Sequence, residues 1–256
     1  MPLRYDPGPI LDWHIEQVSD IDKLECKDPS DFLGFQGLAL ELTRKALPAH
    51  KGLLGFVGGP LTLFCYAVQG GHKGSLAKSL SLIEAGLFDR FCEKLEPVLV
   101  RNIELQSTAD CVAMMDTCAG SLTPDVLKKY IMPWTQRILA QVKVPMLYYS
   151  LGTTSAHLAT IPRQNVVGIG VDWNNSLPDL LMQWPVVQGN INPEALFMDQ
   201  KALRAHLTES WQALSGVSLA GWICGLGHGV LPGTPEENVR FFVQYQREVF
   251  HALRKI

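Results

Sequence analysis

Six short apolar runs constrain the fold of this chain more than any other feature of its sequence. The runs cover residues 53–57, 111–115, 144–150, 166–171, 186–188 and 219–224. Continuous apolar runs are typical of parallel strands that are buried on both faces. The stretches between them have helical periodicity, and one strand–helix unit spans roughly 33 residues, as expected of such units. The sequence therefore predicts an α/β fold in which helices cover a parallel sheet.

Polar residues follow these predicted strands at their carboxyl ends. They are Asp116, Thr117, Ser150, Asp172, Asn190 and His228. In a barrel of eight strand–helix units, the carboxyl ends form the face that holds the active site. The runs supply six of the eight strands, and the residues before Leu53 offer no buried strand, with residues 1–30 expected to be irregular. We therefore expect a TIM-barrel-like (β/α)8 fold that is incomplete and forms one domain over residues 1–256.

The stretch after the last predicted strand contains a histidine between glycines. Gly227 and Gly229 flank His228, and glycines let a ligand approach the backbone closely. Thr234 and Glu237 form a capping box that predicts a helix from about Pro235 to Arg254. His228 is therefore a candidate site residue, with a loop histidine of no role as the alternative.

The composition and charge of the chain limit the classes of binding partner that we expect. The 256 residues carry a net charge of −3 and no basic run, which argues against nucleic acid. We expect no membrane partner either, because no apolar segment is long enough to span a bilayer and the first residues lack signal architecture. The six cysteines are scattered and mostly lie in apolar runs, which is typical of reduced core thiols in a cytoplasmic protein.

Five motifs carry a resemblance to a known family. They are LLGFVGGPLTLFCYAVQGG (53–71), MDTCAGSLTP (115–124), VGIGVDW (167–173), QGNINP (188–193) and GLGHGVLPGTPEENV (225–239). In this order they resemble the uroporphyrinogen decarboxylase family over nearly the whole chain. The resemblance implies a distorted (β/α)8 barrel, of the type shared with methionine-synthase-like methyltransferases, that works as a homodimer without cofactor or metal. It also implies conversion of the four acetate side chains of uroporphyrinogen III to methyls, giving coproporphyrinogen III in haem biosynthesis.

The resemblance also assigns roles to four residues. Tyr66 falls on the family tyrosine that reaches the substrate, and His228 falls on the family histidine near the substrate carboxylates. These two are the catalytic candidates. Thr117 takes the place of a hydroxyl donor, and Phe56 matches an aromatic wall of the cleft, so all four are expected to bind substrate.

Each of these positions also has a plainer interpretation. Tyr66 lies on an apolar helix and is equally compatible with a core tyrosine. Asp116 and Asp172 are suited to capping the helices that follow them. His72 and His157 are expected to be exposed loop residues without a role.

Two charged motifs of the family are absent from the printed sequence: Arg-Gln-Ala-Gly-Arg and a central aspartate, which belong to the first two barrel strands. The eight carboxylates of uroporphyrinogen need cationic partners, preferably arginine, and a carboxylate near the pyrrole nitrogens stabilises a cationic intermediate. Lys73 and Arg163 are the nearest candidates for such cations. We therefore expect low activity of this chain by itself.

Two alternatives to a decarboxylase remain open. One is a non-catalytic porphyrinogen-binding remnant, or a fragment that pairs with a chain supplying the first two strands. The other is a corrinoid-type methyltransferase relative, which would bind zinc through a His-x-Cys pair. The second is disfavoured because no histidine in this chain is followed two residues later by cysteine.

Overall fold

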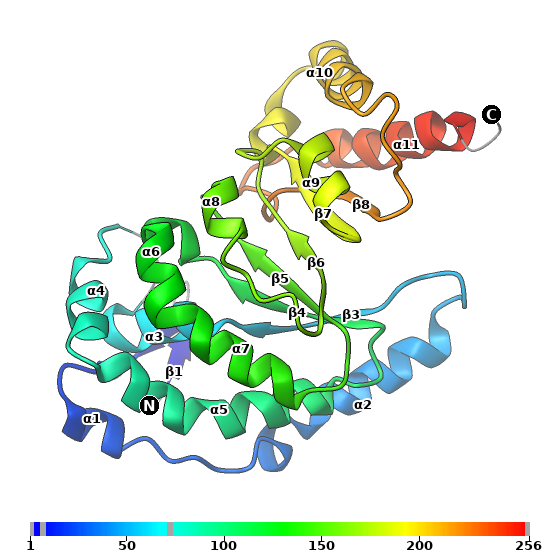
Figure 1. Cartoon of the computed structure of the whole chain (residues 1–256). Coiled ribbons are helices and arrows are strands. Elements are labelled where there is room, and N and C mark those ends of the chain that lie inside the picture. The colour runs from blue at the N-terminus through cyan, green and yellow to red at the C-terminus, as the bar shows by residue number, and fades with distance from the viewer. Residues whose placement is uncertain (1–2, 6–8, 71–73, 254–256) are drawn as a thin grey trace. The chain divides into compact units, whose positions relative to one another are not determined.

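The structure is a computed structural model that describes residues 3–5, 9–70 and 74–253 (Figure 1). It consists of two compact units, Met1–Ile169 and Gly170–Ile256. In each unit strands alternate with helices, and the strand order in the sheet is the order in the chain. The pairs β3–β4, β4–β5 and β7–β8 are parallel. The predicted α/β class with parallel strands is therefore confirmed.

The strands of unit 1 lie close to the predicted runs. They are β3 (Leu54–Gly58), β4 (Cys111–Asp116), β5 (Met146–Ser150) and β6 (Val166–Gly170). The register pairs Gly58 with Met115, and Asp116 with Ser150. The predicted polar positions on β4 and β5 therefore end at the same edge of the sheet.

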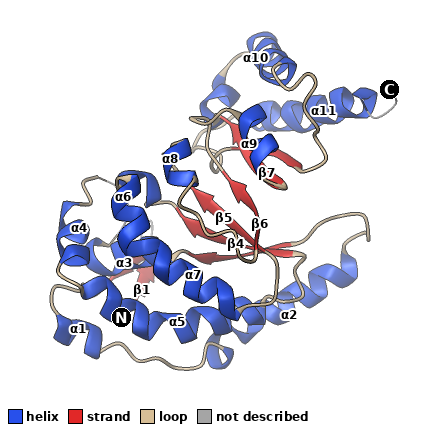
Figure 2. Cartoon of the chain, viewed as in Figure 1, coloured by secondary structure: helices blue, strands red, loops and turns tan. Residues whose placement is uncertain are grey.

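Helices cover this sheet in unit 1 (Figure 2). They are α2 (Ser30–Ala46), α3 (Pro60–Gln69), α4 (Ala77–Glu84), α5 (Leu87–Leu105), α6 (Pro124–Val126), α7 (Met132–Gln141) and α8 (Ser155–Leu158). Helix α3 packs on β4, and α5 packs on β3 and α7. The buried ring of Phe64 on α3 meets Phe88 and Phe91 of α5, with ring centroids 5.3 and 5.4 Å apart. These apolar contacts fix α3, which carries Tyr66.

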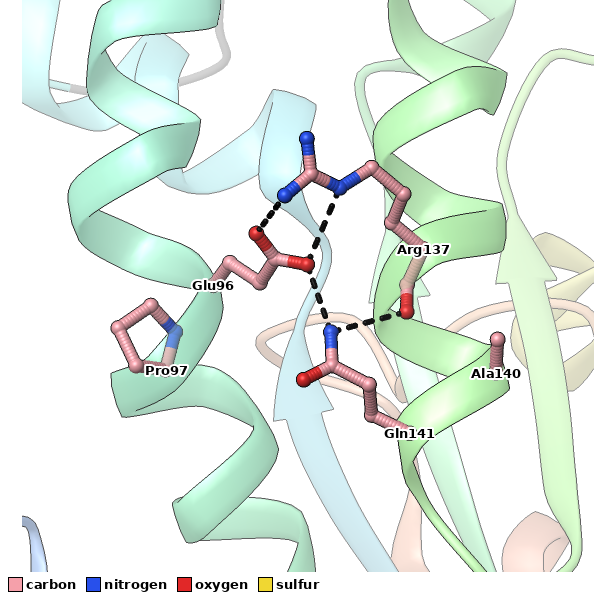
Figure 3. A pocket seen from close by; sticks show the side chains of 5 residues that line it. All are labelled: Glu96, Pro97, Arg137, Ala140 and Gln141. Carbon is pink, nitrogen blue, oxygen red and sulfur yellow. Dashed lines mark hydrogen bonds and ion pairs between the residues drawn. The ribbon is translucent and has the colours of Figure 1, made fainter.

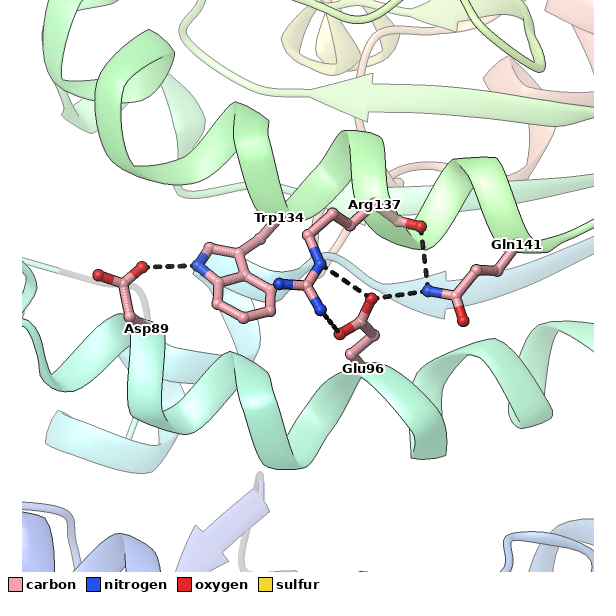
Figure 4. A network of polar contacts seen from close by, with 5 residues as sticks. All are labelled: Asp89, Glu96, Trp134, Arg137 and Gln141. Atoms are coloured by element: carbon pink, nitrogen blue, oxygen red, sulfur yellow. Dashed lines mark hydrogen bonds and ion pairs between the residues drawn. The ribbon is translucent and has the colours of Figure 1, made fainter.

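A polar network fastens α5 to α7 (Figure 4). Arg137 donates from Nε and Nη2 to the two oxygens of Glu96, at 3.2 and 2.6 Å, and Gln141 donates to Glu96 at 2.6 Å. The Arg137 guanidinium lies 4.3 Å from the ring centre of Trp134, whose indole donates to Asp89 at 2.6 Å. The nearly buried Glu96 carboxylate is thus paired, as a buried charge must be.

The first thirty residues contain regular structure, contrary to the expectation that this segment is irregular. Strands β1 (Leu3–Tyr5) and β2 (Pro9–Leu11) form an antiparallel pair, and α1 covers Val18–Asp22. The prediction of an irregular segment is wrong at these places, because three-residue strands and a five-residue helix leave no readable periodicity. Asp20 stabilises the start of α1, accepting from the backbone N–H groups of Glu16 and Gln17.

Helix α2 carries an apolar stripe that does not face the core. Phe32, Phe35, Leu38 and Leu42 are between 52% and 64% exposed. The helix instead turns Gly37 towards α5, where an added Cβ would lie 2.9 Å from the carbonyl oxygen of Leu105. The close backbone approach at the glycine explains why the larger apolar side chains point outwards.

Unit 2 contains two strands and three longer helices. They are α9 (Leu177–Gln183), β7 (Val186–Ile191), α10 (Gln200–Gln212), β8 (Trp222–Leu226) and α11 (Glu236–Leu253), with a 3-10 turn, η3, at Pro193–Phe197. Strand β7 is longer than predicted, and β8 starts three residues later. Asn238 of α11 donates to the carbonyls of Leu196 and Met198 at 2.8 Å, which joins α11 to η3.

Helices in the described residues are too short or too polar to cross a membrane. All six cysteines are free thiols. Four of them are buried and Cys224 is half-buried, as expected of core thiols, whereas Cys26 is exposed.

Candidate functional site

Asp116, at the end of β4, holds the start of helix α3. Its fully buried carboxylate accepts from the backbone N–H and the hydroxyl of Thr62, each at 2.9 Å, and from the Tyr148 hydroxyl at 3.0 Å. Gly59 makes this approach possible, because a Cβ there would lie 2.6 Å from the Asp116 side chain. Asp116 therefore caps α3, which precedes it in the chain, and the alternative that it caps the following helix is wrong.

Burial changes the pKa of the Asp116 carboxyl. Burial raises the pKa of this carboxyl above its ordinary value, and the hydrogen bonds from Thr62 and Tyr148 oppose the rise. Burial likewise raises the pKa of Tyr148 well above its ordinary value. The Tyr148 phenol therefore keeps its proton and donates a hydrogen bond to the Asp116 carboxylate.

Helix α3 brings Tyr66 beside the turn that follows β4. Tyr66 lies one helical turn after Thr62, on the same face of α3. The Thr62 hydroxyl also accepts from the backbone N–H of Cys118 at 3.2 Å, so this face of α3 meets the Thr117–Cys118 turn. Burial, followed by the nearby Cys118 thiolate charge, raises the pKa of Tyr66. Tyr66 and Thr117 are both half-buried, so Tyr66 is not a fully enclosed core tyrosine.

Two buried thiols lie beneath this part of unit 1. Cys65 on α3 and Cys118 after β4 are 0% and 1% exposed, and their side chains are hydrogen-bonded to each other. The contact with Cys118 and burial raise the pKa of the Cys65 thiol far above its ordinary value. Cys65 is thus a neutral core thiol, and the same contact lowers the pKa of the Cys118 thiol.

Phe56 projects from the open face of β3. Phe56 is 70% exposed, and Leu54 on the same face of the strand is 46% exposed. Its backbone is held by Gln106, whose side-chain oxygen accepts from the Phe56 N–H at 2.9 Å and whose amide donates to the Phe56 carbonyl at 3.0 Å. An accessible ring at this position is what an aromatic wall requires, and that role stays a prediction.

The glycine before His228 packs directly against Asp172 and Trp173, which follow β6 in the chain and belong to unit 2. A Cβ at Gly227 would lie 2.7 Å from the Cα of Asp172 and 3.2 Å from the Trp173 ring. The Gly227 N–H donates to the Ile191 carbonyl at 2.8 Å. These contacts, all within unit 2, hold the exposed His228 beside Asp172 and the end of β7.

Other polar residues at strand ends are engaged in local bonds. The buried Asp172 accepts from the backbone and side-chain N–H groups of Asn174 at 3.0 Å, so it closes a turn before α9. Asn190 donates to the Asn175 carbonyl at 2.8 Å. Ser150 shares a 2.9 Å hydrogen bond with Thr153, and both are buried.

His157 is not the exposed loop residue that the sequence suggested. It is 7% exposed, and its Nδ1 lies 2.9 Å from the Thr154 hydroxyl while its Nε2 lies 2.8 Å from the Leu122 carbonyl. The ring thus closes the first turn of α8 and ties it to the segment before α6. His72 and Lys73 lie outside the described residues. Arg163 is exposed.

A shallow cavity of about 420 Å³ lies between α5 and α7 (Figure 3). It is lined by Glu96, Pro97, Arg137, Ala140 and Gln141. The charged groups in its lining already bond to one another, as part of the network between the helices. This cavity is therefore structural and contains none of the candidate residues.

The candidates fall into two groups. Phe56, Tyr66 and Thr117 belong to unit 1, where the structure brings Tyr66 and Thr117 to the same strand ends. His228 belongs to unit 2. Convergence of all four on one hollow stays a prediction. The residues that sequence reasoning missed, Thr62, Tyr148 and Gln106, hold their partners through bonds between distant elements. No local motif signals such bonds.

Parallel strands that alternate with helices define an α/β protein of the TIM-barrel-like class. The chain belongs to the uroporphyrinogen decarboxylase (URO-D) family, whose sequence profile matches residues 1–249. It is 34% identical to the uroporphyrinogen decarboxylase of Microcystis aeruginosa, over 94% of this chain and 71% of that relative. It is 31% identical to the uroporphyrinogen decarboxylase of Myxococcus xanthus, over 98% of this chain and 74% of that relative.

A solved structure shares the fold. The chain resembles a methyltransferase from Methanosarcina mazei with a TM-score of 0.70, at 17% identity, over 97% of this chain and 75% of that one. The TIM-barrel-like fold class is therefore confirmed. Because the two sequences are only 17% identical, this similarity shows a shared fold and does not show a shared function. Among the described residues, no group of three or more His, Cys, Asp and Glu side chains is placed to hold a metal ion.

Proposed function

We propose that this chain is a decarboxylase of uroporphyrinogen. It would remove carbon dioxide from the four acetate side chains and yield coproporphyrinogen, in the cytoplasm, as a homodimer and without a cofactor. Family membership over residues 1–249 supports the activity. The observation that carries the assignment of residues is the anchoring of α3 by Asp116, which presents Tyr66 beside the Thr117–Cys118 turn.

The chemistry assigns a role to each candidate. Loss of carbon dioxide from an acetate arm leaves a carbanion unless the pyrrole is first protonated and takes up the electrons. Because its pKa is raised, the Tyr66 phenol stays protonated at neutral pH and serves as a hydrogen-bond donor to a substrate carboxylate. The Thr117 hydroxyl is a second donor, and the His228 imidazole is the third. Phe56 provides an apolar wall for the tetrapyrrole ring.

The charge balance favours a second candidate function. Eight substrate carboxylates call for cationic partners, and Phe56, Tyr66 and Thr117 supply no positive charge. Leu54 and Phe56 stay exposed on β3, which ends the strand order in unit 1. We infer as the alternative that the chain binds a porphyrinogen and turns it over only together with a polypeptide that pairs at β3 and supplies arginines. A corrinoid-type methyltransferase is supported by likeness of fold alone.

Turnover tests the first proposal. Purified chain is incubated anaerobically with uroporphyrinogen III, and the porphyrins recovered after oxidation are separated by carboxyl number. We expect products with seven to four carboxyls, and at least a tenfold lower rate for Tyr66→Phe. Tyr130→Phe, a half-buried tyrosine next to Lys129 in the same unit, is the matched control and should leave the rate unchanged.

Binding separates the two candidates. Uroporphyrin is titrated into the chain while its absorbance and the tryptophan fluorescence are followed. Saturable binding without turnover supports the binding alternative. Absence of both binding and turnover contradicts the two proposals together.

A further inference from the structure

Helix α2 leaves four large apolar side chains in contact with solvent on one face. Phe32, Phe35, Leu38 and Leu42 are between 52% and 64% exposed. A row of such residues along one helix marks an interaction surface, unlike single exposed apolar residues that are scattered. We propose that this face of α2 pairs with the same face of a second copy of the chain, with the two helices antiparallel. The proposal rests on the homodimer of the proposed function and names its surface, but it does not depend on decarboxylation.

The opposite side of α2 is fixed to the rest of unit 1. Gly37 lies against α5, where an added Cβ would lie 2.9 Å from the carbonyl oxygen of Leu105. Arg44, seven residues later on the same side of the helix, forms an ion pair with Asp110. Phe35 and Leu42 each precede one of these two anchors by two residues, which is about 200° around a helix. The apolar face therefore points away from unit 1 and is free to meet another molecule.

The exposed residues have the spacing of a two-helix seam. Steps of three and four residues alternate along this face, as they do between the a and d positions of a coiled coil. The members of this α2 seam are all exposed, and they are Phe32, Phe35, Ala39, Leu42 and Ala46. In an antiparallel pair, Phe32 faces Leu42 of the second copy and Phe35 faces Ala39 of the second copy. Each layer thus combines a ring with a smaller side chain, so the seam is complementary to itself.

The charges beside the α2 seam favour the antiparallel direction. Asp31 and Lys45 are both exposed, and they lie on the same flank of the seam as Leu38, at equal distances of seven residues from it. A two-fold axis beside Leu38 brings Asp31 of each copy to Lys45 of the other, so the pair contains this contact twice. A parallel pair would leave both charges without this partner. The occupant that matches both the apolar pattern and the charges is therefore a second copy of α2.

The association is measured by sedimentation velocity of the full chain over a range of concentrations. We expect a reversible dimer. Leu38→Glu should weaken it by about a hundredfold, because two carboxylates then meet on the two-fold axis. Met182→Glu is the matched control, since Met182 is 72% exposed in unit 2, and it should leave the dimer unchanged. Thermal melts by circular dichroism confirm that the variants are folded.

Disulfide cross-linking tests the direction of the pair. The exposed Cys26 is first replaced in Cys26→Ser, and single cysteines are then introduced on α2. Leu38→Cys should give a cross-linked dimer under mild oxidation, because the two copies of residue 38 meet at the axis. Ala46→Cys is exposed on the same face but should stay uncross-linked, because an antiparallel pair places the two copies of residue 46 near opposite ends.

A charge exchange tests the pairing of Asp31 with Lys45. Asp31→Lys should weaken the dimer about tenfold, and adding Lys45→Asp should restore it. The double variant opposes the helix dipole at both ends, so its recovery is not explained by a more stable helix.

The outcomes separate this seam from the rest of the proposed function. A dimer that Leu38→Glu does not weaken overturns the seam and leaves the homodimer standing on another surface. Equal cross-linking of Leu38→Cys and Ala46→Cys overturns the antiparallel arrangement. A chain that stays monomeric at every concentration overturns both the seam and the homodimer, and the turnover of uroporphyrinogen decides separately on the decarboxylase.

Discussion

The side-chain amide of Gln106 bonds to both backbone groups of Phe56, accepting from its N–H at 2.9 Å and donating to its carbonyl at 3.0 Å. On the other side of β3, the Leu53 carbonyl accepts from Asp110 and the Gly59 N–H donates to Met115, so alternate residues face β4. The backbone N–H and carbonyl of Phe56 therefore point away from β4. Gln106 therefore occupies the place of a peptide group from a neighbouring strand, and a polypeptide that pairs at this edge of β3 would have to displace it.

Loss of this amide should destabilise unit 1. Gln106 is 4% exposed, so Gln106→Leu preserves the size of a buried side chain but leaves the Phe56 N–H and carbonyl without partners. We expect the free energy of unfolding to fall by about 1–3 kcal/mol. Urea denaturation followed by circular dichroism measures it. Gln136→Leu, at an exposed position of α7, is the control and should change stability by less than about 0.5 kcal/mol. Equal stability of the two variants would contradict the bracing role.

The buried Asp116 carboxyl should give a measurable pH dependence of stability. Because its pKa is raised in the folded state, its contribution is fully present below pH 3.8 and is lost as the pH rises through the folded value. Asp116→Asn lacks this titration. We expect the unchanged chain to be more stable than the variant by about 1–3 kcal/mol at pH 4, and the difference to shrink towards pH 7. Urea titrations at several pH values test this, and a difference that grows with pH contradicts it.

Thiol reactivity should distinguish one cysteine from the rest. Cys26 is exposed, whereas burial raises the pKa of Cys111 to about 11 and that of Cys224 to about 12. The thiolate is the reactive form, so we expect one equivalent of dithionitrobenzoate to react rapidly with the native chain at pH 8. The remaining thiols should react after unfolding in guanidinium. Cys26→Ser should abolish the fast phase, and a fast phase that persists in this variant refutes the assignment.

Much of the fold could be predicted from the sequence, because the β3, β4, β5 and β6 runs are apolar without interruption and are separated by clear helical stretches. The carboxyl-end positions of Asp116 and Thr117 followed directly from that pattern. The partner of Asp116 did not, since Thr62 lies 54 residues away and meets it only through the packing of α3 on β4. For the same reason the apolar stripe of α2 does not show which side of this helix is buried.

His157 shows the same limit for a single side chain. The sequence interpretation placed it in an exposed loop, yet it is buried, and its ring contacts the Leu122 carbonyl, 35 residues away. Short strands such as β1 and β2 could not be predicted for another reason. Three residues are too few to show a period, so their pairing depends on contacts that no local pattern encodes.

The two glycines that flank His228 should respond differently to the same substitution. At Gly227 an added Cβ would lie 2.7 Å from the Asp172 backbone, which cannot yield as a flexible side chain can. At Gly229 no heavy atom lies within 4 Å of an added Cβ. Gly227→Ala should therefore displace the segment that carries His228, whereas Gly229→Ala should leave it in place. We expect Gly227→Ala to weaken uroporphyrin binding at least tenfold and to lower the free energy of unfolding by about 1–3 kcal/mol. Fluorescence titration and urea denaturation of both variants measure the two effects. A Gly227→Ala variant that binds as tightly as Gly229→Ala would show that the His228 segment does not contribute to the site.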